Sequence, residues 1–281
     1  MANRILFIGL LAAALAGAPA HAANCNWSGG AGTSDWFNPA NWANNKVPVS
    51  GDSPRLGNVV PPSPTIWPVY NGDNSASAPT GNFLIAGAMN AEFTMAGGTF
   101  AMGGGAVYLG YGNTTTGGFT GTWTHNGGTF AGPGRAFDIG RYSGATGRLI
   151  MNGGQINAAS MSVGRIAGAA GHVEMYGGTI TVTGGFNLSS EVGATSTLTM
   201  VGGQINCGSS EWAYNGYSTI SIRDAVFYAS NFVSLNNAKN ARAYATIGSG
   251  GVVDADKLVF ARCDVVIEAG GLMQARGLNT G

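Results

Sequence analysis

The sequence is poor in charge. Its 13 basic and 13 acidic residues make up 9% of the 281, against about 25% in ordinary soluble domains. A nucleic-acid binder needs a basic surface to meet phosphates, so the zero net charge argues against nucleic acid as a partner. Long amphipathic helices are not expected either, because their solvent faces need Lys and Glu.

Cysteine and long apolar segments are also scarce. The three cysteines, Cys25, Cys207 and Cys263, form neither a CxxC pair nor a cluster with histidine, so we expect no zinc site. Their odd number allows one internal disulfide at most, and buried thiols are the simpler expectation. After the N-terminal residues no apolar run reaches the ~18 residues that a membrane helix needs.

The first 22 residues read as a secretory signal peptide. Arg4 supplies the positive charge, residues 5–15 are nearly all apolar, and Ala20-His21-Ala22 is a small-x-small cleavage site. The sequence therefore predicts a secreted or cell-surface protein. A lipoprotein anchored at Cys25 is the alternative, and Asn24 disfavours it because the residue before such a cysteine is normally very small.

Glycine is abundant, with 48 residues, and it marks an internal repeat. Gly-Gly pairs begin at positions 97, 127, 153, 177 and 202, so they recur at intervals of 30, 26, 24 and 25 residues. An apolar residue lies four positions before each pair, and a methionine lies two positions before every pair except the second, where His125 stands. This is the period-2 pattern of a strand with one buried face. A second short strand follows each pair, and a third recurs about ten to twelve residues after it.

Three short strands per ~25 residues predict a right-handed parallel β-helix of about seven coils over residues 81–281. Each coil buries its apolar residues only by stacking on the next coil. A β-sandwich or barrel is the rival fold, and it would use antiparallel hairpins with short turns. The shared register of five copies favours the β-helix.

Residues 23–80 differ from the repeats and hold eight of the ten prolines. They contain Trp27, Trp36 and Trp42, whose large side chains would cover the open end of a β-helix core. We therefore predict an N-terminal cap. The alternative is a tryptophan platform that stacks on sugar rings.

The opening motif W-GG-DW-NW-P-GD followed by GG[TQ][IF] coils resembles a class of exported bacterial repeat proteins. This class includes autotransporter passengers with strand repeats and PEP-CTERM-type exported proteins. The resemblance covers nearly all of residues 25–281 and implies a parallel β-helix outside the cytoplasm, often of unknown activity. The chain has neither a VPEP sorting tail nor a barrel translocator, so we expect it to be truncated at its C-terminus.

Catalytic chemistry has little support in the sequence. Glycosidases need two carboxylates across the scissile bond, and the best acids are Asp254 with Asp256 and the outward-facing Asp138. Neither place offers an acid pair with a basic partner, so we expect solvated surface groups. His125 replaces methionine in a core-facing column and is expected to be structural. We predict no catalytic residue, no metal site and no cofactor.

One column of turn residues points to ligand binding. Tyr111, Arg141 and Arg165 each follow the small residue that ends the third strand, so they should stack on adjacent coils. Two guanidinium groups beside an aromatic ring suit an acidic glycan or another carboxylate. On this reading Arg165→Ala weakens binding of an anionic polysaccharide without lowering the melting temperature.

The leading functional prediction is a non-enzymatic structural or adhesive protein of the cell surface or matrix. Its expected partners are extracellular polysaccharides or other surface proteins. The first alternative is a polysaccharide-active lyase or glycosidase. The second is a filament subunit that joins end to end through its strand edges.

Overall fold

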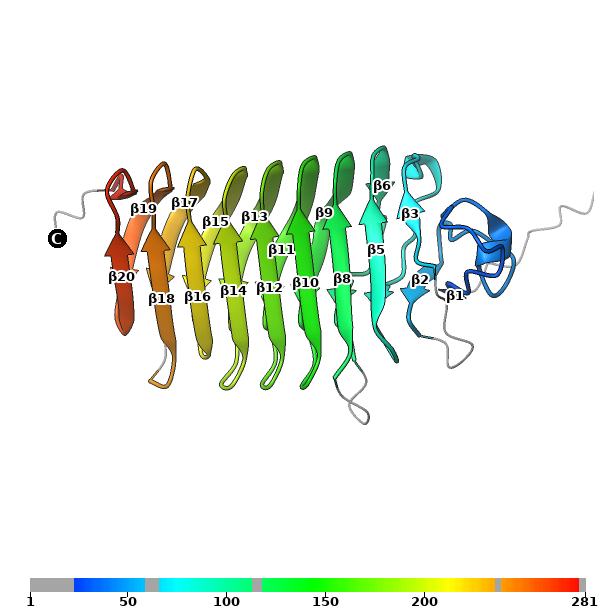
Figure 1. Ribbon diagram of the computed structural model, residues 1–281, viewed down its shortest axis with the longest axis horizontal. Helices are drawn as coiled ribbons and strands as arrows, with labels where there is room; N and C mark the ends of the chain where they lie inside the picture. Colours follow the sequence, from blue (N-terminus) through cyan, green and yellow to red (C-terminus); the bar gives the residue numbers. More distant parts are fainter. Residues whose placement is uncertain (1–22, 59–65, 113–117, 236–238, 278–281) are drawn as a thin grey trace, which may run out of the picture.

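The computed structural model describes residues 23–58, 66–112, 118–235 and 239–277, which form an elongated rod of stacked coils (Figure 1). The predicted parallel β-helix is confirmed, with about nine turns instead of seven. One uncounted turn begins at β3 (Val69–Tyr70), which lies before the first Gly-Gly pair and therefore has no motif to reveal it.

One sheet, called sheet II here, contains one strand from each turn. All of its neighbouring strands pair in parallel. Its strands are β3, β5 (Ala91–Met95), β8 (Thr120–His125), β10 (Thr146–Met151), β12 (Ala170–Met175), β14 (Thr195–Met200), β16 (Tyr217–Ile222), β18 (Arg242–Ile247) and β20 (Cys263–Ile267).

Sheet I lies behind sheet II in Figure 1 and has 12 strands. These are β1 (Asn24–Asn26), β2 (Ser53–Leu56), β4 (Phe83–Ile85), β6 (Thr99–Ala101), β7 (Val107–Leu109), β9 (Thr129–Ile139), β11 (Gln155–Val163), β13 (Thr179–Leu188), β15 (Gln204–Trp212), β17 (Val226–Leu235), β19 (Val252–Phe260) and β21 (Leu272–Ala275). Two short 3-10 helices, Pro39–Asn41 and Ser75–Ser77, precede the regular coils.

The predicted three strands per coil are distinct only near the N-terminus. There β6 and β7 are separate strands, and both pair with β9. From β9 onward the second and third strands form one continuous strand whose register shifts near its middle. The shift lets the strand bend, as at a β-bulge, so hydrogen bonding to the neighbouring coils continues on both sides of the corner.

Like residues stack on like positions in the core, as the repeat alignment predicts. In sheet II the register places Met95 against His125, His125 against Met151, and Met151 against Met175. These side chains are fully buried. Because every coil repeats the same inward pattern, one apolar core runs along the rod.

The tryptophan-rich segment closes the N-terminal end of this core. Trp36 and Trp42 pack edge to face with ring centroids 4.7 Å apart, and Trp27 packs on Trp42 in the same way at 5.2 Å. Trp36 also contacts the rings of Phe83 and Phe93 in the first coils. The indole N–H of Trp42 donates to the Trp36 carbonyl, so burying that polar group leaves no unmade bond.

The two glycines of each pair differ in backbone conformation. The second glycines, at 98, 128, 154, 178 and 203, have φ between +72° and +78°, whereas the first glycines do not have positive φ. A Cβ on Gly98 would also clash with the carbonyl oxygen of Gly72 on the preceding coil, while a Cβ on Gly97 would meet nothing within 4 Å. In this first pair, only the second position therefore requires glycine.

We predict that Gly98→Ala lowers the free energy of unfolding by about 2 kcal/mol or more, because positive φ alone costs an L-residue about 1–2 kcal/mol. Gly97→Ala is the matched control and should change stability by less than about 1 kcal/mol. Urea denaturation of both variants tests this. Equal losses in the two variants would contradict the assignment.

His125 makes stability depend on pH. Burial lowers its pKa to about 4, partly opposed by its hydrogen bond with the Gly128 carbonyl, whereas an unfolded histidine titrates near 6.5. Between these values the unfolded chain binds more protons, so the folded state loses stability as pH falls from about 6.5 toward 4.

We expect His125→Met to remove this loss, because methionine fits the ladder between Met95 and Met151. Relative to the wild type, the variant should gain about 1–2 kcal/mol on going from pH 7.5 to pH 5. Denaturation curves at the two pH values measure the gain. If the difference in free energy of unfolding between variant and wild type is the same at both pH values, His125 does not cause the pH dependence.

Candidate functional site

The connections that lead from sheet I back to sheet II line one long edge of the rod, at the bottom of Figure 1. We call this the loop edge. Three successive connections start at a glycine with positive φ, namely Gly110, Gly140 and Gly164. A Cβ at any of the three would clash with a backbone carbonyl of sheet II, on the strand one coil beyond the strand that the connection enters. The positive φ and the close approach explain the small residue seen in the sequence, which is Ser189 and then Ala213 in the next two coils.

The residues after these glycines are Tyr111, Arg141 and Arg165, and they lie on successive coils. The Arg141 amide donates to the Gly110 carbonyl at 3.2 Å, and the Arg165 amide donates to the Gly140 carbonyl at 2.9 Å. These bonds hold the backbone of the column in register. The alignment of the repeats is therefore sufficient to bring the three residues together.

Asp138 joins the two arginines. The expectation of a solvated outward carboxylate is wrong, because Asp138 is only 1% exposed. Arg165 Nη1 donates to both of its oxygens, at 3.0 and 2.8 Å, and Arg141 Nη1 forms a second ion pair with it. A buried carboxylate needs such partners, since leaving it unpaired is costly. Together the three groups carry one net positive charge.

Tyrosine rings surround the arginines. The Arg141 guanidinium carbon lies 4.3 Å from the centroid of the Tyr108 ring and 5.5 Å from that of Tyr142, within cation–π range. Tyr111 packs on Tyr142 with centroids 4.9 Å apart. We call Tyr108, Tyr111, Arg141, Tyr142 and Arg165 the Arg–Tyr cluster. All five side chains are partly exposed over the buried Asp138.

The cluster shifts the pKa values of two tyrosines in opposite directions. Burial raises the pKa of Tyr111, and its hydrogen bond with Tyr142 raises it further. That hydrogen bond lowers the pKa of Tyr142, and the hydrogen bond with Arg141 lowers it again. The cluster is thus a cationic, hydrogen-bonding surface with aromatic faces, which suits recognition of an anion on a flat apolar scaffold.

The other residues proposed for glycan binding lie elsewhere. Trp27, Trp36 and Trp42 are each 1% exposed, so they present no ring face to a ligand and do not form an open sugar platform. Their rings pack against one another and against the N-terminal end of the core. The sequence could not separate the two roles, because a cap and a platform use the same residue type.

The remaining acids and thiols offer no recognisable chemistry. Asp254 and Asp256 are not independent solvated groups, since Arg276 forms ion pairs with both, at 2.8 and 3.2 Å. Across the described ranges, no three His, Cys, Asp or Glu residues gather as metal ligands. The three cysteines are free thiols. No helix in the described part of the chain is long and apolar enough to cross a membrane.

A second surface on the loop edge escaped the sequence analysis. It is a groove of about 590 Å³ at the C-terminal end of the edge, lined by Tyr217, Lys239, Arg242, Tyr244 and Arg262 among others. Of these residues, only Arg262 continues the turn column of Tyr111, Arg141 and Arg165, four coils after Arg165. The available signal was the replacement of threonine by tyrosine in the outward positions of the last coils.

No protein-family model, no curated protein and no solved structure matches this chain.

The ion pairs with Asp138 change what is expected of Arg165→Ala. Because Arg165 is 41% exposed and Arg141 still neutralises Asp138, the single variant should lose about 1 kcal/mol of stability, and its melting temperature should fall. Removing both arginines leaves a buried, unpaired carboxylate and should cost about 3 kcal/mol or more. Adding Asp138→Asn to the double variant should recover part of that loss.

Chemical denaturation of the single, double and triple variants tests this network. A double variant that loses no more than the sum of the two single losses would show that Asp138 does not depend on the pair.

Proposed function

We propose that this protein is an extracellular, non-enzymatic structural or adhesive β-solenoid that binds an acidic glycan along its loop edge. The observation that carries the proposal is the Arg–Tyr cluster over the buried Asp138. Arg141 and Arg165 are held in place by a carboxylate that is itself inaccessible, so their remaining N–H groups are pre-oriented for a ligand.

The ligand class follows from the chemistry of the cluster. Guanidinium groups form paired hydrogen bonds with carboxylates and sulfates, and tyrosine rings pack on the apolar faces of sugars. An acidic polysaccharide offers both features in every repeat unit. A rod whose coils recur along one axis suits such a linear partner, because many weak contacts can add along its length.

The N-terminal sequence supports placement outside the cytoplasm. Residues 1–22 have the charge, apolar stretch and cleavage site of a signal peptide, and they lie outside the described residues. Cys25 is buried in β1 and accepts a hydrogen bond from the Asn44 side chain, so it is poorly placed to carry a lipid. We therefore propose secretion without a lipid anchor at Cys25.

The test is binding of polygalacturonate, a polymer of uronic acid, with neutral dextran as the comparison. Affinity electrophoresis should show retardation of the wild type in polygalacturonate only. Arg165→Ala should weaken binding about fivefold to tenfold, measured well below the melting temperature of the variant. Added salt should weaken binding as well, because the contacts are ionic.

Arg223→Ala is the matched control. Arg223 pairs with Glu268 on the surface, and it lies at the corner where sheet II leads to sheet I, away from the loop edge. It should bind like the wild type. If Arg165→Ala and Arg223→Ala lose equal binding affinity, the loss reflects net charge alone and the cluster is refuted as a site. Release of reducing sugar by the wild type would instead establish the enzymatic alternative.

A further inference from the structure

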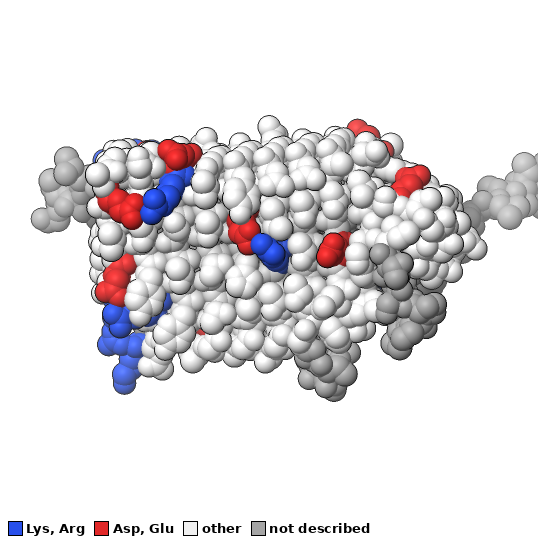
Figure 2. Space-filling model, in the orientation of Figure 1, with Lys and Arg blue, Asp and Glu red and all other residues white. Residues whose placement is uncertain are grey.

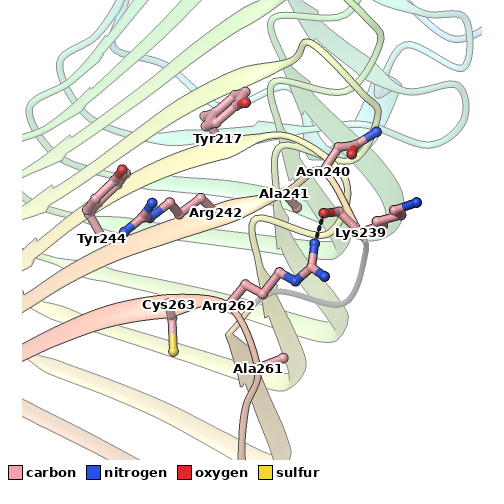
Figure 3. A pocket seen from close by; sticks show the side chains of 9 residues that line it. All are labelled: Tyr217, Lys239, Asn240, Ala241, Arg242, Tyr244, Ala261, Arg262 and Cys263. Atoms are coloured by element: carbon pink, nitrogen blue, oxygen red, sulfur yellow. Dashed lines mark hydrogen bonds between the residues drawn. The ribbon is translucent and has the colours of Figure 1, made fainter.

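The groove at the C-terminal end of the loop edge is a second site of distinct composition (Figure 3). Its walls come from the starts of β16 and β18, from residues 239–241 and from residues 261–263. Its volume of about 590 Å³ falls in the range of roughly 300–1,000 Å³ that is usual for small-ligand sites. The groove can therefore hold one or two sugar rings.

The groove carries an excess of positive charge in a chain with no net charge. Lys239, Arg242 and Arg262 line it, and the neighbouring acid Asp264 pairs with Arg242 at 2.7 Å. The Arg262 guanidinium donates to the Lys239 carbonyl, which holds it across the groove in Figure 3. Figure 2 shows basic side chains projecting at this end of the loop edge, whereas the rest of that face carries scattered charges.

Two tyrosines stand on the groove wall with much of their rings in solvent. Tyr217 is 52% exposed and Tyr244 is 43% exposed. Arg242 pairs with Tyr217 in the sheet register, and its guanidinium lies 5.1 Å from the centroid of the Tyr244 ring. Figure 3 shows the Arg242 guanidinium beside the Tyr244 ring, with Tyr217 on the neighbouring strand. One cation–π pair and a second exposed ring therefore line this wall of the groove.

This arrangement departs from the repeat. At the position of Tyr217, the four preceding strands of sheet II carry Thr195, Ala170, Thr146 and Thr120. At the position of Tyr244, the preceding strands carry Thr219, Thr197, His172, Arg148 and Thr122. Threonine suffices for an exposed sheet face, so packing does not require tyrosine here. Local breaks in a regular pattern are expected at functional sites.

We infer that this tyrosine groove binds an anionic sugar, with Tyr217 and Tyr244 against the sugar ring and Arg242, Lys239 and Arg262 around its carboxylate or sulfate. The inference rests on the proposed function for its ligand class, but the site is separate from the Arg–Tyr cluster. Arg165 and Arg262 occupy the same turn column four coils apart, about 19 Å at ~4.8 Å per coil.

The two sites lie on one edge, so a long chain can occupy both. Tyr214 lies on the edge between them and is exposed. Glu191 also lies between them, and it is an exposed acid. A polyanion that spans the edge must pass this carboxylate, which predicts that Glu191→Gln strengthens binding of the polymer and not of short oligomers.

The test is isothermal titration of trigalacturonate, which is too short to bridge the two sites, with the full chain and four variants. The wild type should bind two molecules per chain. Tyr244→Ala and Tyr217→Ala should each weaken one of the two binding events about fivefold to tenfold, and Arg165→Ala should weaken the other. Tyr176→Ala is the control, because Tyr176 is 53% exposed at a Gly-Gly corner away from the loop edge.

Several outcomes would overturn the groove assignment. If Tyr217→Ala and Tyr244→Ala bind trigalacturonate as tightly as Tyr176→Ala does, the two tyrosines do not contact the sugar. The wild type could also bind anionic lipid vesicles or single-stranded DNA as tightly as uronate and lose that binding in the same variants. The groove would then be a general polyanion surface. A different outcome separates the two proposals. If the wild type shows the tyrosine-dependent binding event but none that depends on Arg165, the Arg–Tyr cluster is refuted as a site and the groove assignment stands.

Discussion

The structure depends on the parallel register between one coil and the next. A single coil of this chain has two short strand segments and a few apolar side chains, which is too little to bury a core. In register, each coil completes the backbone hydrogen bonds of its neighbours and continues their ladders of methionine, isoleucine and aromatic residues. The corner glycines serve the same constraint, because positive φ lets each turn close without pushing the next coil away.

The same register builds the candidate sites. Residues 24 to 30 positions apart in the sequence come within one coil spacing. The repeat alone therefore places Tyr111, Arg141 and Arg165 on neighbouring coils. Asp138 then changes the character of the column. A carboxylate buried beneath two arginines converts flexible surface cations into oriented ones, while it cancels half of their charge. The cluster is thus less cationic but better ordered than two solvated arginines would be.

The groove shows how a repeat architecture gains a local feature. Its tyrosines replace threonine at positions where the sheet tolerates either residue, so the fold is unaffected by the exchange. Arg242 lies at the start of β18, and Lys239 lies in the connection that leads into that strand. Function in such a rod can therefore change through a few outward residues, while the inward pattern keeps the coils stacked.

The amino-acid sequence alone determined the β-helix, the inward ladders, the corner positions and the proximity of Arg141 to Arg165. All of these follow from periodicity, and stacked coils convert sequence period directly into spatial neighbourhood. Only the tertiary structure decided that Asp138 is buried, that the second and third strands merge, that Trp27, Trp36 and Trp42 are enclosed, and that a groove opens beside Tyr217 and Tyr244. Those features depend on how deep a side chain lies and on the path of connections that do not repeat. Alternation along a strand says which face a residue is on, but not what the neighbouring coils place over it.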